Sequence, residues 1–553
     1  MLDVEARPHS VFHLLPFVSV IICVLATYLF VGTREMTLPG VYMDAVNPDY
    51  LVVKLLNRHH AEPLVAWVLP GNYLRNRVPV LISLYHGLQQ FWLGLPLYAI
   101  FGTSVVGIRL THMVFAAGVL IGMLVLLRKA GVAVWICALC GIAVAVDPSF
   151  VFAFRTQSYI TMAPVMWLLF SIYALFQAED CRTTWRACFF LASGACFGFA
   201  VLGYFVYAFY VPVLLLAIGL WSPRESEAVP FVRARANAMV MWLVGAMLGS
   251  AYYLVGYALV ARAHGGGIGG FLSYVAEYSA RLDAFGAALS MEARLATAWA
   301  FLRSVFTNGW HHSLMFGSAE PVPFSSLKLV ILAALPILFL LYAEFSHRAS
   351  RILRIAVGLP VCFFVVSLVF GERLGGHHYM SLLPISYVAL AAAPAAVWPD
   401  KSTGSIVAAF CLGILVAING FALDREFATL RRTGGVGLFS DAVNHLAIDL
   451  ASLSPEPFVY FPDWGLAFPV TLISGGTIPS STDIDVGEAR RVLCSGKDVA
   501  IAMVGDDRSR IATWADRLHW GPPRVTPYRQ RDGAIVIDLV TFTGSPDNPA
   551  CRS

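Results

Sequence analysis

The chain has 553 residues, of which 58% are apolar and only 13% are charged, about half the charged fraction of an ordinary soluble protein. The formal net charge of +4 is too small to suggest a nucleic-acid-binding protein, and no arginine- or lysine-rich run with interleaved aromatic residues occurs. The charges also avoid long stretches that can cross about 30 Å of hydrocarbon as helices. These features indicate an all-α polytopic membrane domain.

Apolar runs of membrane-spanning length follow one another along most of the chain. The first run is too long for a signal-peptide core and is followed by no small-x-small cleavage site, so we expect an uncleaved span. Three stretches are too long and too polar to be membrane: 32–80, 262–326 and 424–553. The candidate spans are 12–31, 81–101, 104–127, 132–153, 159–177, 187–204, 205–221, 238–261, 327–345, 356–371, 382–398 and 406–423.

Lysine and arginine residues in the short loops predict the orientation. They place 262–326 and 424–553 outside, but the same count carries 32–80 to the inside. One candidate run is therefore not a simple span. We expect the run that is wrongly counted as a crossing to lie within 81–127 or 187–221. We keep all three polar stretches on one outer face and predict about 11 to 13 spans. A transmembrane domain over 1–423 and a soluble exported domain over 424–553 follow.

The tail alternates strand-like and helical segments. "PFVYFP", "DVAIAMVG" and "GAIVIDLVTF" are typical of strands, whereas "DAVNHLAIDLAS", "GEARRVLCS" and "DRSRIATWADRLHW" have helical periodicity. This alternation predicts a small α/β domain with a mainly parallel sheet. It contains no G-x-G-x-x-G or Walker loop that would support nucleotide binding. Cys494 and Cys551 would be able to form a disulfide if the tail is exported.

The first polar stretch, "GVYMDAVNPDYLVVKLLNRHH", concentrates ionisable groups directly after the first span. Asp44 stands close to the membrane surface, where a carboxylate can take a proton from a hydroxyl; the alternative is a solvated loop acid. Asp49 follows a proline and is either a second catalytic acid or a helix cap. The segment that includes Arg58 predicts interfacial helices, which either anchor the loop or hold an anionic lipid headgroup.

Three vicinal histidine pairs share the predicted outer face. Hydrogen bonding to phosphate or sugar hydroxyls is the plainer use of these imidazoles. A divalent metal is an alternative. Zinc needs three or four convergent ligands, and an acid together with one histidine from each pair would supply them. The metal would then be held by His59, His311 and His378, and the pairs are His59-His60, His311-His312 and His377-His378.

Two further arginines accompany acids at span boundaries. Arg155 follows Asp147 by eight residues in "VDPSFVFAFRTQSY", and the two either form a structural pair or leave Arg155 to bind phosphate. Arg373 is next to Glu372 and shortly before His377. It either forms a structural pair with Glu372 or binds phosphate.

The order of these features resembles the GT-C superfamily of membrane glycosyltransferases, within it the group that includes protein O-mannosyltransferases, the lipid A aminoarabinose transferase and the rhizobial galacturonosyltransferases. The segments that carry the resemblance are "YMDAVNPDY", "PVLISLYHGLQQFWLGLPLYAIFGTSVVGIRL", "VAVDPSFVFAFRTQSY" and "GGHHYMSLLPISYVALAAA". The family commonly has Asp-Glu in its first loop, whereas here Ala45 follows Asp44, which puts the second carboxylate role of Asp49 in doubt.

The resemblance implies an inverting transferase that moves a sugar from a polyprenyl-phosphate donor to an acceptor hydroxyl. Asp44 would be the base, and the spans around the first loop would form the lipid groove. Arg58, His59, Arg155, Arg373, His377 and His378 are then candidates for binding the donor phosphate or substrate, and the acceptor is a glycan, a lipid or a protein. We expect the bacterial cytoplasmic membrane, with the active site facing the periplasm.

Three other classes remain alternatives, and one of them is a non-catalytic membrane protein whose tail binds a partner. A polytopic transporter would show internal repeats and paired acids deep in two spans, which we do not find. A lipid-linked glycan ligase or polymerase would place arginine and histidine in a long late loop, as 262–326 does with His311-His312. Substitution of Asp44 separates the ligase or polymerase from a first-loop transferase, because a late-loop enzyme should tolerate its loss.

Overall fold

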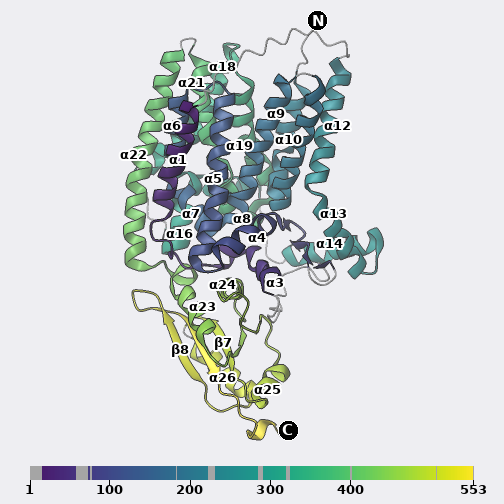
Figure 1. The fold of residues 1–553 in the computed structure, drawn as a ribbon, viewed down its shortest axis with the longest axis vertical. Helices are drawn as coiled ribbons and strands as arrows, with labels where there is room; N and C mark the ends of the chain where they lie inside the picture. The colour runs from purple at the N-terminus through teal and green to yellow at the C-terminus, as the bar shows by residue number, and fades with distance from the viewer. Residues whose placement is uncertain are drawn as a thin grey trace.

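The computed structural model describes residues 15–57, 73–74, 78–181, 183–221, 231–283, 290–318, 324–398, 401–505 and 507–551. A bundle of long helices makes up the upper part in Figure 1, and a smaller domain with a sheet hangs below its lower end. The two parts are the membrane domain and the C-terminal α/β domain that the composition predicted.

Within the described residues, seven helices are long and apolar enough to cross a membrane, and two bent pairs raise the number to nine. The protein is therefore an integral membrane protein. The spans comprise α1 (Leu15–Gly32), α5 (Val105–Lys129), α8 (Ser158–Thr161) with α9 (Ala163–Asp180), α10 (Thr183–Gly203), α17 (Ser325–Leu329) with η4 (Val330–Ala334) and α18 (Leu335–Phe345), α19 (Arg351–Phe370) and α22 (Lys401–Thr433), together with the bent pairs α6 (Val134–Ala145) with α7 (Pro148–Thr156) and α12 (Phe231–Gly249) with α13 (Ala251–Ala263).

The expected span at 81–101 is not one. It consists of the short antiparallel strands β3 (Leu81–Ser83) and β4 (His86–Gly87) and the helix α4 (Gln89–Phe101), whose 13 residues are too few to cross a bilayer. Two shorter apolar elements, η3 (Phe205–Tyr210) with α11 (Val211–Gly219), and α21 (Leu382–Val397), pack within the bundle.

The number of crossings is odd, because α1 begins at the upper end of the bundle and α22 ends at the lower end (Figure 1). Nine spans together with the two shorter apolar elements satisfy this requirement. Because 81–101 is not a span, the loop-charge count now places 32–80 on the same side as 262–326 and 424–553.

The described parts of the three polar stretches gather at the lower end of the bundle (Figure 1). They therefore share one face, as we expected for all three stretches, although the loop-charge count alone had placed 32–80 on the opposite side. They contain α2 (Met43–Val46), η2 (Asp49–Val52), α3 (Val53–Leu56), β1 (Tyr73–Leu74), β2 (Val78–Pro79), α14 (Gly267–Asp283), α15 (Met291–Phe306), α16 (Gly309–Phe316) and the chain from η6 (Gly437–Phe439) onward.

Small residues let α10 and α12 approach closely. Gly194 and Gly198 on α10 face Gly245 and Gly249 on α12, and a Cβ at any of these positions would collide with backbone of the other helix. Two facing G-x-x-x-G patterns are typical of helix pairs in membranes, where close packing replaces the hydrophobic effect.

A buried polar cluster joins the bent pair α6–α7 to the later spans. Asp147 caps α7 through the Ser149 N–H at 2.9 Å, and its carboxylate accepts hydrogen bonds from Lys328 Nζ at 2.7 Å and the Tyr387 hydroxyl at 2.8 Å. All these groups are buried. The predicted Asp147–Arg155 pair is therefore wrong: the break at Pro148 turns the acid toward Lys328, 181 residues along the chain.

The C-terminal domain is a five-stranded sheet in the order β6-β5-β7-β9-β8. Strands β5, β6 and β7 are parallel, but β9 is antiparallel to both β7 and β8. The sheet is mixed, not mainly parallel, since β8 returns directly into β9 through a short turn. The elements are α23 (Ala442–Ser452), β5 (Phe458–Tyr460), α24 (Ala467–Ile473), β6 (Ser480–Ser481), α25 (Val486–Cys494), β7 (Val499–Val504), α26 (Arg508–Leu518), β8 (Arg524–Arg529), β9 (Ile535–Phe542) and η7 (Pro549–Cys551).

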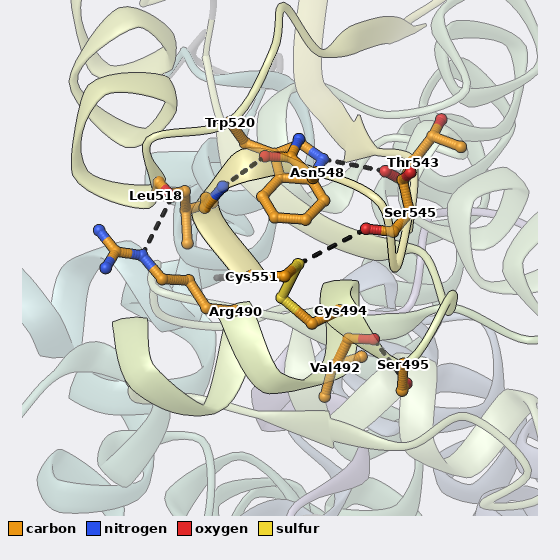
Figure 2. The surroundings of a disulfide bond; sticks show 11 residues. Arg490, Val492, Cys494, Ser495, Leu518, Trp520, Thr543, Ser545, Asn548 and Cys551 are labelled. Atoms are coloured by element: carbon orange, nitrogen blue, oxygen red, sulfur yellow. Dashed lines mark hydrogen bonds between the residues drawn. A yellow bond between two sulfur atoms is a disulfide. The ribbon is translucent and has the colours of Figure 1, made fainter. Parts of the chain in front are cut away.

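A disulfide ties the end of the chain to this domain. Cys494, at the end of α25, is bonded to Cys551 in η7, with a Cα–Cα distance of 5.6 Å (Figure 2). Nearby, the Trp520 indole N–H donates to the Thr543 carbonyl at 2.9 Å. Because disulfides persist in oxidising compartments, this bond is consistent with an exported domain.

Candidate functional site

The α/β domain holds the segment that carries Asp44. After α1 the backbone packs against the C-terminal domain, where the Gly40 N–H donates to the Phe439 carbonyl at 2.7 Å and the Val41 N–H to Asn444 Oδ1 at 2.9 Å. A Cβ at Gly40 would collide with the backbone of that domain. The chain then enters the short helix α2, whose first turn contains Asp44. Two distant parts of the chain thus fix the position of this acid.

Asp44 is linked to two other segments by a short chain of hydrogen bonds. Gln157, at the break between α7 and α8, donates from Nε2 to Asp44 Oδ2 at 3.4 Å. The Trp310 indole N–H of α16 donates to Gln157 Oε1 at 3.0 Å, which fixes the orientation of the amide. The three side chains come from the first loop, a break between two helices and the late outer loop.

The environment of Asp44 suits a base. Burial raises the pKa of Asp44 from 3.8 to about 6, and the hydrogen bond from Gln157 limits that rise. At pH 7 the carboxylate is therefore about nine-tenths ionised, and its affinity for a proton is higher than that of an ordinary aspartate.

Aromatic and imidazole side chains form one wall beside Asp44. Tyr159 and Tyr204 lie within electrostatic range of the carboxylate, and their rings are 5.6 Å apart. The His86 ring stacks on Tyr159 with centroids 4.7 Å apart. His86 is buried, its Nε2 has no hydrogen-bond partner in the described part of the chain, and burial lowers its pKa to about 3. A neutral imidazole in this setting can bind a hydroxyl group.

The structure brings His377 and His378 to the same site. They lie on α20 (Gly376–Tyr379); His378 Nε2 is 3.4 Å from the Tyr204 hydroxyl, and His377 lies 5.9 Å from the Trp310 ring. His378 Nδ1 lies 2.8 Å from the Gly375 backbone nitrogen and 3.0 Å from the Gly375 carbonyl oxygen, so the backbone of this residue fixes the orientation of the ring. Burial lowers the pKa of both imidazoles, that of His378 to about 4. They are therefore neutral hydrogen-bonding groups at pH 7.

Asp49 lies in a separate buried network. Its Oδ2 accepts hydrogen bonds from the Tyr98 hydroxyl at 2.6 Å and Gln90 Nε2 at 3.0 Å, and it lies 2.7 Å from His112 Nε2. Asp49 is not the helix cap, because it is the first residue of η2 and Pro48 occupies the N-cap position. These contacts tie the first loop to α4 and α5, which favours a structural role over the catalytic one.

The Arg155 side chain donates hydrogen bonds to backbone carbonyls. Its Nη1 donates to the carbonyls of Glu35 at 3.0 Å and Leu38 at 2.8 Å, and its Nη2 to those of Gly32 at 2.9 Å and Arg34 at 2.5 Å. The guanidinium thus ends α1 and shapes the turn that follows it. Because these bonds occupy both Nη groups, the geometry favours a positioning role over phosphate binding.

The late-loop histidines also have a partner. His311 Nε2 lies 3.0 Å from Glu426 Oε2, and His312 Nδ1 lies 3.8 Å from Glu426 Oε1, all three residues being buried. Among the described residues, no group of three or more histidine, cysteine or acidic side chains could hold a metal. His59 and Arg58 lie outside the described residues, so the metal alternative stays a prediction.

An apolar cavity of about 340 Å³ opens between α15, α18, α19 and α21. It does not lie between the spans around the first loop, where the lipid groove was expected. Phe301 joins this region to the site, because it precedes the lining residue Leu302 and its ring is 5.9 Å from that of Trp310. The side chains that line the cavity include Trp299, Leu302, Phe306, Pro336, Pro360 and Phe364.

Arg373 is exposed in η5 (Gly371–Arg373), between α19 and α20.

Sequence reasoning did not assign the residues that surround Asp44 most closely. Gln157 was visible as a polar residue at a break in an apolar run, a signal that could have marked it. His86 and Tyr204 lie within apolar runs of the predicted spans, and Trp310 directly precedes the pair His311-His312, so none of the three has a distinct signal in the sequence.

No family model matches the chain, and no curated protein matches it in sequence. Among solved structures, ArnT from Cupriavidus metallidurans bound to undecaprenyl phosphate is 13% identical over 97% of this chain and 99% of its own, with a TM-score of 0.42. The apo Archaeoglobus fulgidus oligosaccharyltransferase is 12% identical over 88% of this chain and 69% of its own, with a TM-score of 0.46.

The S. cerevisiae protein O-mannosyltransferase Pmt1–Pmt2 complex, bound to its sugar donor, is 17% identical over 45% of this chain and 34% of its own, with a TM-score of 0.34. The chain is thus similar to membrane glycosyltransferases. Because the TM-scores of these three structures are below 0.5, we base the proposed function on the residues of the site.

Proposed function

We propose that the protein is an inverting membrane glycosyltransferase that moves a sugar from a polyprenyl-phosphate donor to an acceptor hydroxyl, with Asp44 as base. The observation that carries the proposal is the half-buried Asp44 carboxylate, which has a raised pKa of about 6 and is linked through Gln157 to Trp310. A carboxylate with this pKa is ionised at neutral pH yet is a stronger base than an exposed aspartate.

The proposed reaction forms one bond and breaks one. Asp44 takes the proton of the acceptor hydroxyl while the hydroxyl oxygen attacks the anomeric carbon of the donor. The bond from that carbon to the phosphate oxygen breaks, its electron pair leaves with polyprenyl phosphate, and the anomeric centre inverts. Neutral His377 and His378 would donate hydrogen bonds to the sugar or the phosphate, and the exposed Arg373 would balance the charge on the leaving group.

The apolar cavity supports a lipid-linked donor. Its lining of aromatic, proline and aliphatic side chains suits a prenyl chain and not a polar ligand. It adjoins the site through Phe301 and α15, so a lipid tail there would place its phosphate end near α20. We also propose that the site and the C-terminal domain face the periplasm of a bacterial cytoplasmic membrane, which the disulfide supports.

A panel of radiolabelled polyprenyl-phosphate sugars, tested with the purified protein, checks the proposal. The assay follows release of free polyprenyl phosphate by the wild type, by Asp44→Asn and by Asp49→Asn. We expect one donor to be turned over and this turnover to collapse only in Asp44→Asn, provided that both variants fold. Turnover that survives Asp44→Asn would move the chemistry to the late loop and favour the ligase alternative.

A further inference from the structure

The C-terminal domain has a crevice beside the proposed catalytic helix. The carboxyl ends of the parallel strands β6, β5 and β7 meet at one edge of the sheet, and a cavity of about 180 Å³ lies there. Its walls are the loop 461–465 after β5, Thr482 and Asp483 after β6, residues at the start of α24, and Met43 of α2. Ligands of open α/β sheets commonly bind at this edge. We call this cavity the edge crevice.

The loop that forms the edge crevice is held firmly. Asp463 Oδ2 accepts a hydrogen bond from the Val504 N–H at 2.7 Å, and its Oδ1 accepts one from Arg510 Nη2 at 2.8 Å. Gly465 adopts a φ of +104° and packs against the Tyr42 ring, which leaves no room for a Cβ. The crevice is therefore preformed and docked on the first loop.

The groups that face the edge crevice suit a sugar. The Trp464 side chain is 47% exposed and offers an apolar ring face on which the C–H face of a pyranose can pack. Thr482 Oγ1 is buried and has no hydrogen-bond partner among the described residues, and the Asp483 carboxylate is exposed and can accept from hydroxyls.

The charge of the edge crevice disfavours an anionic ligand. The Arg510 guanidinium beside it is paired with Asp463, and Asp483 adds a further negative charge. A phosphate or an acidic headgroup would meet these carboxylates, whereas a neutral or basic sugar would not.

We propose that the edge crevice binds a sugar ring of the acceptor, so that the acceptor is a glycan with a neutral or basic sugar near the reacting hydroxyl. This inference rests on the proposed function. Met43, which lines the crevice, and Asp44 are consecutive in α2, and Tyr42 interacts both with Trp464 and with Asp44. A ring held on Trp464 would therefore present an adjoining hydroxyl to the base across one short helix. The C-terminal domain then selects the acceptor.

Saturation-transfer NMR on the full-length protein in detergent micelles, with a panel of neutral and basic methyl glycosides, tests this proposal. We compare Trp464→Ala, Asp483→Asn and the near-isosteric Thr482→Val with two controls. The control for the tryptophan is Trp135→Ala, whose side chain is 51% exposed at the start of α6, far from the domain. The control for the acid is Asp516→Asn, exposed on α26.

We expect at least one glycoside to receive saturation from the wild type and from Asp44→Asn. Trp464→Ala should weaken that binding by at least about fivefold, Asp483→Asn and Thr482→Val should weaken it too, and neither control should change it. The proposal is overturned if no glycoside binds, if the three crevice variants bind as well as the wild type, or if a serine- or threonine-containing peptide competes at the crevice in place of a sugar.

The outcome is separable from that of the donor assay. Glycoside binding that depends on Trp464, in a protein that turns over no lipid-linked donor, would support the sugar site and count against the transferase. Donor turnover that depends on Asp44, without any glycoside binding, would support the transferase and overturn the sugar site.

Discussion

Asp44→Asn should make the protein inactive and, at neutral pH, more stable. The fold raises the pKa of Asp44 from 3.8 to about 6, so the folded state holds a proton on this group more tightly than the unfolded state does. The ionised carboxylate therefore costs stability as pH rises from about 4, and the cost is complete above about pH 6. At about 1.4 kcal/mol per pH unit it reaches up to about 3 kcal/mol.

The asparagine variant keeps the shape of the side chain but never carries this charge. Its melting temperature in detergent should exceed that of the wild type at pH 7.5 and approach it at pH 4, where the aspartate is largely protonated too. Release of polyprenyl phosphate should fall by about 10²–10⁴-fold in the variant, the usual contribution of a general base. In the wild type, the rate should decline below about pH 6 as the base becomes protonated.

The two measurements check each other, because loss of activity through unfolding would lower the melting temperature. A variant that is active, or a wild-type rate that stays constant down to pH 4.5, would refute the assignment of Asp44 as base. A variant that is less stable than the wild type at pH 7.5 would show that the carboxylate has a stabilising partner that this reasoning omits.

Three other substitutions test the site and its supports. Gln157→Leu removes the hydrogen bond that limits the pKa rise of Asp44, so the decline of the rate in acid should move to higher pH, which a pH–rate profile measures. Arg155→Leu leaves four carbonyls without their donor and should lower the melting temperature sharply with no selective rise in donor KM, whereas a phosphate ligand would give the reverse. Lys328→Met leaves Asp147 buried and unpaired and should cost about 3–5 kcal/mol of stability, more than the double variant Asp147→Leu/Lys328→Met, in thermal unfolding of the detergent-solubilised protein.

The sequence by itself determined the features that depend on local composition and period. Apolar runs of sufficient length identify most spans, because a helix in lipid must satisfy its own backbone. Loop charges place the two later polar stretches on one face, and strand and helix periods mark six elements of the α/β domain. That Asp44 comes shortly after the first span is likewise visible in the sequence.

Tertiary structure decided which partners these residues have. Asp147 meets Lys328 and not Arg155, and Gln157 meets Trp310, because helix breaks and bundle packing bring together segments more than 150 residues apart. The antiparallel pairing of β9 and the loss of the run 81–101 as a span have a similar cause, since neither pairing nor membrane crossing is set by a segment alone. Charge, burial and hydrogen bonding at Asp44 all come from such distant contacts, and they are what make an ordinary aspartate a candidate base.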